Sequence, residues 1–481
     1  MTRKLFLIGS VLLAIGHSSF EQIVVKSIRS FGAKGDGKTN DTQAFQKAAS
    51  YFNSIGGNGK LIIPKGTYIV GLQDLSNGQK NKPCYSGEDI LHFINVKNFT
   101  VQGQKGALLK FADGLRFGAF DPTTKQAYDH GNTRFTNYAY AAQAGTCICL
   151  ENCNGVKITG IIMNGNNTKA AMGGIYGDVG IQLAYDGISI LNSHNITIDS
   201  VTASYFGRDG LYVLNQPGSQ PDNILIQHSL FEYNCRQGFS WVGGNGVTVK
   251  NCGFNHTGKS SYMSAPGAGV DIEGEVGIST NGIFENSSFI DNSGCGIVSD
   301  GGGRDSDCHF INCTFWGSTS YAVWVTKPAF SFLNCTIYGS IAHGYSSAND
   351  NDATRFTKCH IEDRSYNGNK QRDGYLINTN GAYRMSFDNC TLVANTIKLM
   401  WMDTRVTVPV EEKYNVSNCH FIVMGSAYPQ KDFVGVMRGV NYKNNTLEFK
   451  DPAAKNKGYW LSGCCDANTI DLGGNTIIYD K

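Results

Sequence analysis

A short motif that ends in Asn-Cys-x-apolar recurs along the chain and limits the folds that it can adopt. Each of six cysteines stands two positions before a large apolar residue, and five of the six follow an asparagine. The six are Cys252, Cys313, Cys335, Cys359, Cys390 and Cys419. From the second to the sixth, the gaps are 22, 24, 31 and 29 residues, which is typical of a structural repeat. We interpret these cysteines as small hydrophobic residues that face inward, since they lack the paired C-x-x-C spacing of zinc sites.

A second motif, Gly-apolar-x-apolar, alternates with the first. It begins at Gly187, Gly210, Gly238, Gly269, Gly296, Gly344 and Gly374, and the first four gaps are 23, 28, 31 and 27 residues. Strict alternation indicates a strand with one buried face. The gaps are too short for strand–helix–strand units, and a β-propeller needs about 40 residues per repeat. The sequence therefore predicts an all-β, single-stranded parallel β-helix, with each repeat forming one coil over residues 98–425.

Composition agrees with a strand-and-turn protein. The chain of 481 residues has 58 Gly and only 10 Pro. Its 41 Lys and Arg and 39 Asp and Glu give a net charge of +2, and 41% of the residues are hydrophobic. These values exclude intrinsic disorder and count against nucleic-acid binding through bulk positive charge, because counterion release needs a basic surface.

The first residues predict export. Arg3 and Lys4 precede an apolar run from Leu5 to Ile15, which is typical of a signal peptide over residues 1–19, with a buried strand or helix as the alternative. No later segment is apolar enough for a membrane span, so we expect a secreted or periplasmic protein. Disulfide pairing is an open alternative for Cys464 and Cys465 and for the cluster of Cys147, Cys149 and Cys153.

Residues 20–97 differ from the coils. Apolar residues at positions 44, 45, 48, 49 and 52 predict a short capping helix, with Asp41 as its N-cap. A solenoid needs such a cap because its first coil otherwise exposes core and strand edge. Residues 426–481 are expected to form the last coils and a C-terminal cap.

The segments 30–45, 56–59 and 63–68 read SFGAKGDGKTNDTQAF, GGNG and IPKGTY. This opening resembles that of the pectate-lyase-like superfamily, which includes relatives of glycoside hydrolase family 28. The resemblance implies a right-handed β-helix that acts on carbohydrate, but the fold hosts several reactions. The polygalacturonase motifs Asn-Thr-Asp, paired Asp, Gly-His-Gly and Arg-Ile-Lys are absent, which counts against ordinary pectin hydrolysis.

Three acids come together if equivalent strands stack in register. Asp271 and Glu273 point outward on one strand, about 6–7 Å apart, and Asp300 occupies the position of Glu273 on the next coil, roughly 5 Å away. Like charges this close raise one pKa, which gives the protonated acid and the ionised carboxylate of a glycosidase. We predict that these three residues are catalytic. The alternatives are a calcium site, the one cofactor that the pattern suggests, or a solvated acidic surface.

Six residues near these acids are predicted to bind substrate. They are Arg208, Asp209, Tyr212, Arg236, Lys259 and Trp324. The arginines suit a carboxylate or sulfate group, and Trp324 suits a sugar face. The alternatives are a turn-capping role for Asp209, charge neutralisation by the arginines and packing of Trp324 beneath a loop.

The resulting hypothesis is a carbohydrate-active enzyme that hydrolyses glycosidic bonds of a polysaccharide or oligosaccharide in a groove on the rod. Two other classes stay open. A lyase or C5-epimerase acting on a uronate polymer would use Tyr212, Lys259 and the arginines, with calcium held by the acids. A binding module without turnover is the third.

Overall fold

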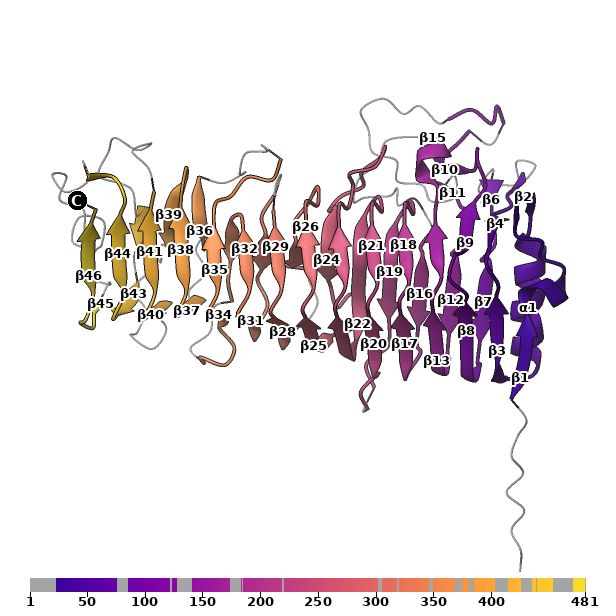
Figure 1. The fold of residues 1–481 in the computed structure, drawn as a ribbon, viewed down its shortest axis with the longest axis horizontal. Helices are drawn as coiled ribbons and strands as arrows, with labels where there is room; N and C mark the ends of the chain where they lie inside the picture. Colours follow the sequence, from indigo (N-terminus) through magenta and orange to yellow (C-terminus); the bar gives the residue numbers. More distant parts are fainter. Residues whose placement is uncertain are drawn as a thin grey trace, which may run out of the picture.

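The computed structural model describes residues 23–75, 85–121, 123–127, 141–173, 183, 185–218, 220–301, 305–317, 320–345, 349–367, 374–379, 385–402, 414–424, 435–437, 439–452 and 470–480. The chain forms a long rod of stacked parallel strands, with α1 (Thr42–Ser54) at the N-terminal end (Figure 1). The predicted parallel β-helix is therefore confirmed. The predicted signal peptide, Cys464 and Cys465 lie outside the described residues.

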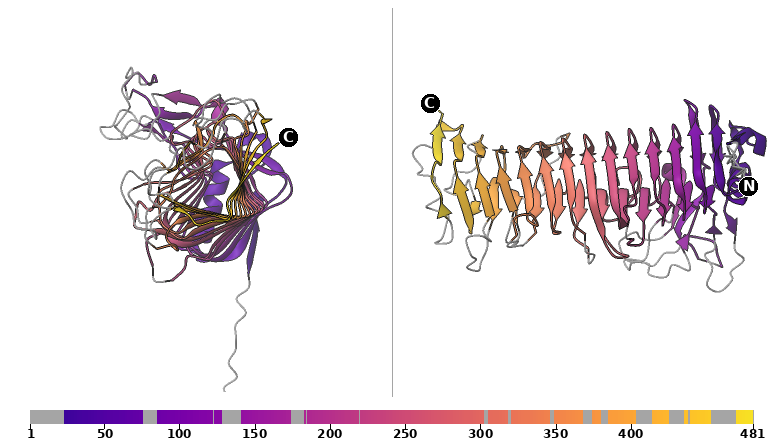
Figure 2. Two further views of the ribbon diagram at one scale, coloured as in Figure 1. Left: turned by 90° about the vertical axis from the view of Figure 1, so that its left-hand side faces the viewer. Right: turned by 90° about the horizontal axis from the view of Figure 1, so that it is seen from below.

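From residue 91 onward, each complete coil that the structure describes contributes one strand to each of three faces. In one coil, β16 (Ile188–Leu191) lies on face 1, β17 (Ile196–Asp199) on face 2 and β18 (Thr202–Ser204) on face 3. Each strand pairs in parallel with its equivalent in the next coil: β19 (Asp209–Leu214), β20 (Ile224–Gln227) and β21 (Leu230–Glu232). The view along the rod shows these strands stacked behind one another (Figure 2).

The other strands continue these three faces. Face 1 also contains β7 (Leu91–Ile94), β12 (Ile148–Glu151), the first part of β22 (Gln237–Lys250), β24 (Ala268–Ile272), β27 (Ile297–Ser299), β30 (Val323–Val325), β33 (Ile341–His343), β36 (Tyr375–Asn378), β39 (Lys398–Met402) and β42 (Gly435–Met437).

Face 2 also contains β1 (Val24–Ser27), β3 (Gly57–Ile63), β8 (Lys97–Gly103), β13 (Asn154–Thr159), the second part of β22, β25 (Ser279–Glu285), β28 (Cys308–Ile311), β31 (Phe330–Leu333), β34 (Thr354–Thr357), β37 (Met385–Asp388), β40 (Tyr414–Ser417), β43 (Val440–Lys443) and β45 (Ile470–Asp471).

Face 3 also contains β2 (Asp36–Asn40), β4 (Gly66–Val70), β9 (Ala107–Phe111), β14 (Ile162–Asn164), β23 (Gly253–Asn255), β26 (Ser288–Ile290), β29 (Thr314–Trp316), β32 (Thr336–Tyr338), β35 (His360–Glu362), β38 (Thr391–Ala394), β41 (His420–Val423), β44 (Thr446–Phe449) and β46 (Thr476–Tyr479). Outside the three faces lie β5 (Asp74–Leu75), β6 (Tyr85–Ser86), β10 (Arg116–Ala119), β11 (Ala141–Ala142), β15 (Ala171–Gly173), and the short 3-10 helices η1 (Ile28–Phe31) and η3 (Asn167–Lys169).

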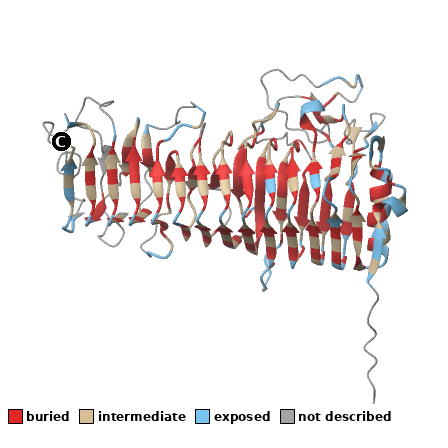
Figure 3. Cartoon of the chain, in the orientation of Figure 1, coloured by how far each residue is buried: buried red, intermediate tan, exposed pale blue. Residues whose placement is uncertain are grey.

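The core is a column of side chains inside the coils. Buried and less buried residues alternate along the strands (Figure 3), as the period of a half-buried strand requires. On face 2, the phenylalanine rings of successive coils stack with centroids 4.6–5.0 Å apart. This column contains Phe284, Phe310, Phe332, Phe356 and Phe387. The spacing is set by the backbone ladder, which places equivalent strands one hydrogen-bond step apart.

The corner between faces 2 and 3 explains the Asn-Cys motif. Asn334 turns the chain with a φ of 52°, a conformation that asparagine tolerates better than most residues. Its side-chain amide donates to Oδ1 of Asn312 on the preceding coil at 2.8 Å. The Cys335 thiol is buried and donates to the backbone carbonyls of Phe310 and Leu333. The six motif cysteines are all buried and free, which confirms the sequence interpretation.

The N-terminal cap has the predicted helix but a different capping contact. Asp41 occupies the N-cap position of α1, yet its carboxylate makes no side-chain hydrogen bond to that helix. It accepts hydrogen bonds from the backbone N–H groups of Lys34 and Gly35 at 2.8 and 3.0 Å. Asp41 therefore ties the preceding loop to the helix start. Cys147, Cys149 and Cys153 are buried and free.

Coil pairing begins before residue 98 and continues beyond residue 425. β3 pairs with both β1 and β8, and β44 pairs with β46. The predicted end segments thus carry strands of the same stack. Among the described residues, no helix combines the length and the apolar character that a membrane crossing requires.

Candidate functional site

The strand register places polar side chains from distant parts of the chain in one row on face 1. Tyr212 pairs with Ser240, Ser240 with Asp271, Asp271 with Val298, and Val298 with Trp324. A second row contains Asp186, Asp209 and Gln237, which directly precede the glycines of their coils. Trp241 points inward and is fully buried, as its place in the alternation predicts. The register on which the acid cluster depends is therefore present.

Asp186 anchors the N-terminal end of the cluster. It is fully buried and accepts a two-pronged contact from the Arg208 guanidinium, including Arg208 Nε to Asp186 Oδ1 at 2.8 Å. Ser189 Oγ and the backbone N–H of Asp209 also donate to this carboxylate, at 3.0 and 3.1 Å. The Arg208 guanidinium lies 4.8 Å from the centre of the Tyr212 ring. Arg208 and Tyr212 are thus held in place by Asp186, which the sequence prediction left out of the site.

Asp209 is a fully buried carboxyl group between two cations. Its Oδ2 lies 3.8 Å from Arg208 Nε and 4.0 Å from Arg236 Nη1. Burial raises the pKa of Asp209 to about 7, against the opposing effect of Arg236 and with a further increase from the negative charge of Asp186. Only 11% of the Arg236 side chain is exposed, and the neighbouring carboxylates raise its pKa against the effect of burial.

Asp271 is held by a polar neighbour on the preceding coil. It is 2% exposed, and its Oδ2 accepts a hydrogen bond from Gln237 Nε2 at 2.5 Å. Gln237 is itself fixed, because its Oε1 accepts from the backbone N–H of Ala268 at 2.9 Å. The second oxygen, Oδ1, is buried, and none of the described residues gives it a hydrogen bond. Burial, and then the negative charge of Glu273, raise the pKa of Asp271 well above its ordinary value.

Glu273 and Asp300 are the more accessible members of the cluster. Glu273 is partly buried and Asp300 is exposed. Burial raises the pKa of Glu273, with Arg236 opposing it and nearby acids, including Asp300, adding to it. Asp300 also acts electrostatically on Asp271. The three predicted acids therefore interact with one another, and they differ in burial.

Asp305 is a further acid that the strand pattern did not indicate, since it lies in a turn. It is buried, and its Oδ1 accepts a hydrogen bond from the backbone N–H of Ser279 at 3.3 Å. Burial raises the pKa of Asp305 to about 6, while a hydrogen bond from the Gly274 backbone lowers it. Asp305 in turn adds to the increase at Glu273. It thus strengthens the acidic field around the cluster.

The other two predicted residues have different surroundings. Lys259 Nζ lies 3.4 Å from Asp291 Oδ1, in the turn that follows face 3, where His256 also contacts Asp291. Among the described residues, Lys259 makes no ion pair with Asp271, Glu273 or Asp300. Trp324 lies in the predicted row, with ring centroids 4.1 Å from His343 and 5.0 Å from Tyr321. Its indole Nε1 is buried and has no hydrogen-bond partner in the described part of the chain.

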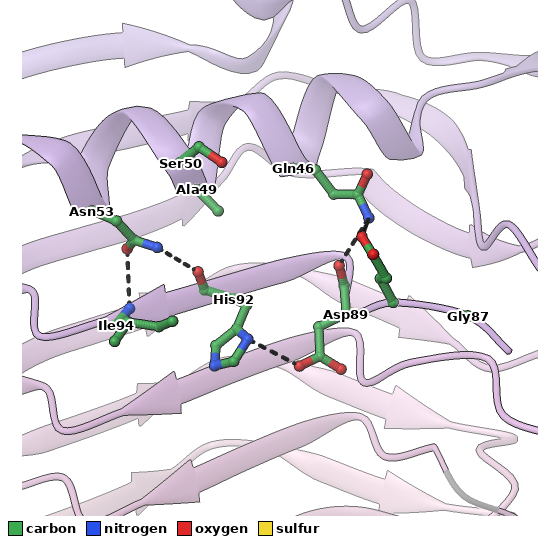
Figure 4. A pocket seen from close by; sticks show the side chains of 9 residues that line it. Gln46, Ala49, Ser50, Asn53, Gly87, Asp89, His92 and Ile94 are labelled. Atoms are coloured by element: carbon green, nitrogen blue, oxygen red, sulfur yellow. Dashed lines mark hydrogen bonds and ion pairs between the residues drawn. The ribbon is translucent and has the colours of Figure 1, made fainter. Parts of the chain in front are cut away.

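A separate cleft lies nearer the N-terminal end of face 1. Its volume is about 490 Å³, and it is lined by α1 and by the residues around β7 (Figure 4). The carboxylates of Asp89 and Glu88 and the ring of His92 contribute to its wall. The acid cluster begins on a later coil at Asp186: burial raises the pKa of Asp89 in the cleft, and the negative charge of Asp186 adds to that increase.

Comparison with known families supports the fold. The sequence model of a family described as "Right handed beta helix region" matches residues 181–329. Polygalacturonase ADPG1 of Arabidopsis thaliana is 24% identical over 301 residues, which cover 56% of this chain and 62% of that protein. Plasmin and fibronectin-binding protein A of Streptococcus pneumoniae (strain ATCC BAA-255 / R6) is 24% identical over 236 residues, covering 44% and 32%. Each alignment thus spans less than two thirds of the relative.

Several solved structures are similar to this chain along most of its length. The A-module of the mannuronan C-5 epimerase AlgE6 of Azotobacter vinelandii is 12% identical, with 95% of this chain and 99% of that chain covered and a TM-score of 0.47. The family 28 exopolygalacturonase of Yersinia enterocolitica is 11% identical, with 95% and 78% covered and a TM-score of 0.38. Together, the strand ladder and the family match show that the chain is a right-handed parallel β-helix protein.

Proposed function

We propose that this protein is a secreted or periplasmic carbohydrate-active enzyme that hydrolyses glycosidic bonds of a polysaccharide or oligosaccharide on face 1. The observation that carries the proposal is a buried carboxyl group, Asp271, with a raised pKa beside the more accessible Glu273 and Asp300. A glycosidase needs one protonated carboxyl group and one ionised carboxylate at the bond that it cleaves. The polygalacturonase among the relatives supports the class of substrate.

In the proposed reaction, Asp271 is the general acid. Its proton passes to the glycosidic oxygen as the bond from that oxygen to the sugar C1 breaks, and the sugar left behind gains positive charge. Glu273 or Asp300, ionised, stabilises that charge and then acts in one of two ways. It takes a proton from the water molecule whose oxygen bonds to C1, or it bonds to C1 itself and is released when a water molecule, deprotonated by Asp271, attacks the same carbon. Arg236 favours the ionised form of Glu273, because it opposes the increase in the pKa of that residue.

Substrate binding is assigned to the row on either side of the acids. Trp324 offers an aromatic surface one coil beyond Val298, and Tyr212 lies one coil before Ser240. Sugar C–H groups pack against such rings. Arg236 is the cation nearest the acids, whereas Arg208 is already engaged by Asp186 and Lys259 by Asp291. We therefore expect Arg236 to contribute more to substrate binding than the other two cations.

The test combines product analysis with one substitution. Purified protein is incubated with a panel of neutral and acidic polysaccharides, and reducing ends and ultraviolet absorbance of unsaturated uronates are both followed. We expect reducing ends without that absorbance, and no loss of rate with a chelator. Asp271→Asn is expected to lower the rate by about 10²–10⁴-fold, the usual contribution of a general acid.

The matched control is Asp199→Asn. Asp199 lies on face 2 and contacts Lys157 and His228, away from the row on face 1. Its substitution should leave the rate unchanged, and circular dichroism should show that both variants are folded. Formation of an unsaturated product that requires calcium would contradict hydrolysis and indicate a lyase reaction. Saturable polysaccharide binding without turnover would contradict an enzymatic function and indicate a binding protein. Full activity of Asp271→Asn would remove Asp271 from the mechanism.

A further inference from the structure

Four residues outside the acid cluster bring nitrogen, sulfur and oxygen donors together on face 1. Register pairs His92 of β7 with Cys149 of β12, and Ile94 with Glu151. Asp89 lies in the turn just before β7. One ligand atom each from Asp89, His92 and Cys149 lies within 4.8 Å of the other two. Asp89 and His92 lie 57 or more positions before Cys149 in the sequence.

The histidine lies between two carboxylates. His92 Nδ1 is 3.3 Å from Asp89 Oδ2, and His92 Nε2 is 3.0 Å from Glu151 Oε2. At protein metal sites, one ring nitrogen binds the ion and the other usually donates to a carboxylate, which fixes the tautomer and ring orientation. In this protein, Glu151 is the carboxylate beside Nε2, and Nδ1 is the ring nitrogen beside the candidate ligand Asp89.

The backbone around the donors is held by α1 and by the next coil. Asn53 Nδ2 donates to the carbonyl oxygen of His92 at 2.9 Å, and Asn53 Oδ1 accepts from the N–H of Ile94 at 3.0 Å (Figure 4). Asp89 Oδ1 accepts from the backbone N–H of Thr146 at 2.6 Å. Asp89 and His92 are thereby oriented before any ligand is bound, which lowers the entropic cost of binding.

The donor types distinguish between cations. Calcium and magnesium prefer oxygen ligands, whereas zinc and similar divalent transition metals bind cysteine sulfur, histidine nitrogen and carboxylate oxygen. A site with three protein ligands leaves a coordination position for another oxygen ligand. Asp89 and His92 line the cleft of about 490 Å³, so such a ligand has access.

We propose that Asp89, His92 and Cys149 form a binding site for a zinc-class divalent transition metal, with Glu151 orienting the His92 ring. The site lies at the N-terminal end of the same face as the acid cluster. It does not depend on the proposed hydrolysis, because metal binding is measured without any sugar.

Cobalt provides the direct probe. Chelator-treated protein is titrated with Co²⁺ alone, and near-ultraviolet charge transfer from thiolate sulfur to cobalt is recorded; Zn²⁺ is then added in competition. We expect one Co²⁺ per chain, a charge-transfer band, and loss of the band when Zn²⁺ is added. Glu151→Gln should keep the band but weaken binding by about 10–100-fold, as loss of an outer carboxylate does at other sites.

Substitution of the sulfur ligand separates a metal site from an ordinary ion-pair network. Cys149→Ser should remove the band and weaken binding at least as much as Glu151→Gln does. Cys295→Ser, a partly buried cysteine elsewhere on the rod, is the matched control and should retain both. If Cys149→Ser does not fold, His92→Ala supplies the same test at a more accessible residue. Absence of Co²⁺ binding to the unmodified protein, or an unchanged band in the folded Cys149→Ser variant, would overturn the proposal.

Discussion

The Asn-Cys corner and the acid row on face 1 are both stacks of side chains from successive coils, but they differ in how their polar groups are satisfied. At the corner, Asn334 donates to Asn312, and the Cys335 thiol donates to backbone carbonyls. In the acid row, Asp271 Oδ1 and Arg236 Nε are buried and have no hydrogen-bond partner among the residues that the structure describes.

The difference teaches how to separate structural from functional stacks in a β-helix. A buried polar group without a partner costs about 1–3 kcal/mol, whereas a paired one is close to neutral or favourable. The corner repeats one satisfied arrangement, so it stabilises the rod. The row around Asp271 retains a costly arrangement, and such exceptions concentrate at functional sites.

The largest expected effect on stability lies in the core column behind the corner. Phe310→Ala should lower the free energy of unfolding by about 3–5 kcal/mol, because the ring leaves a cavity between Phe284 and Phe332. Denaturant unfolding followed by circular dichroism measures the loss. Phe310→Leu, which keeps most of the volume, should recover much of it. Equal stability of Phe310→Ala and the unmodified protein would contradict the view of this column as the structural stack.

The acid row should make stability depend on pH. The pKa of Asp209 is about 7 in the folded protein and about 4 when unfolded. Between these values the folded state keeps a proton that the unfolded state loses, so the free energy of unfolding falls as pH rises from about 4 to about 7. Asp271 and Glu273, whose pKa values are also raised, act in the same direction. Asp209→Asn should therefore reduce this slope without abolishing it.

Thermal unfolding at several pH values between these limits checks the slope. Asp199→Asn is the control, because hydrogen bonds and ion pairs outweigh burial and lower the pKa of Asp199 to about 2. The stability that Asp199 contributes is present above its unfolded pKa of about 4 and is lost as pH falls through about 2. Its variant should keep the slope above pH 4. A steeper slope in Asp209→Asn would show that the buried row does not hold its protons as described.

The smallest effect is expected at a single corner residue. Asn334→Ala should cost about 1 kcal/mol, because alanine is strained at a φ of 52° and the hydrogen bond to Asn312 is lost. Asn334→Gly removes the hydrogen bond but not the backbone conformation, and it should cost less. Denaturant midpoints of the two variants separate the contributions. Equal losses with glycine and alanine would assign the stability of the corner to the side-chain hydrogen bond alone.

The sequence was sufficient for the fold because period-two alternation, marked by Gly and Asn-Cys, fixes which side chains face inward. It placed Trp241 in the core and Asp271 in the outward row. Counting residues between coils also predicted that Asp300 lies on the coil after Asp271, two residues beyond its register partner Val298.

Other features of the site depend on contacts that no single repeat contains. Asp186 holds Arg208 across neighbouring coils, which requires the directions of both side chains. Lys259 lies in the long connection between β23 and β24, where its side chain contacts Asp291. Asp305 lies outside the strands, just before β28, and contacts the backbone of Ser279. His92 and Cys149 lie 57 positions apart, about twice the spacing of the other repeats, so residue counting could not align them.

One strand ties two faces together beside the acids. β22 pairs along its first part with β19 and β24, and along its second part with β20 and β25, so it continues round a corner that other coils cross in a turn. Gly244 and Gly246, with φ values of 127° and 92°, allow the bend. A peptide grafted into this corner would interrupt two hydrogen-bonded ladders at once, whereas an insertion next to the exposed Gly218 one coil earlier would interrupt no strand. Engineers who wish to reshape the surface around Asp271 should therefore extend the exposed connections between strands and leave the bend of β22 unchanged.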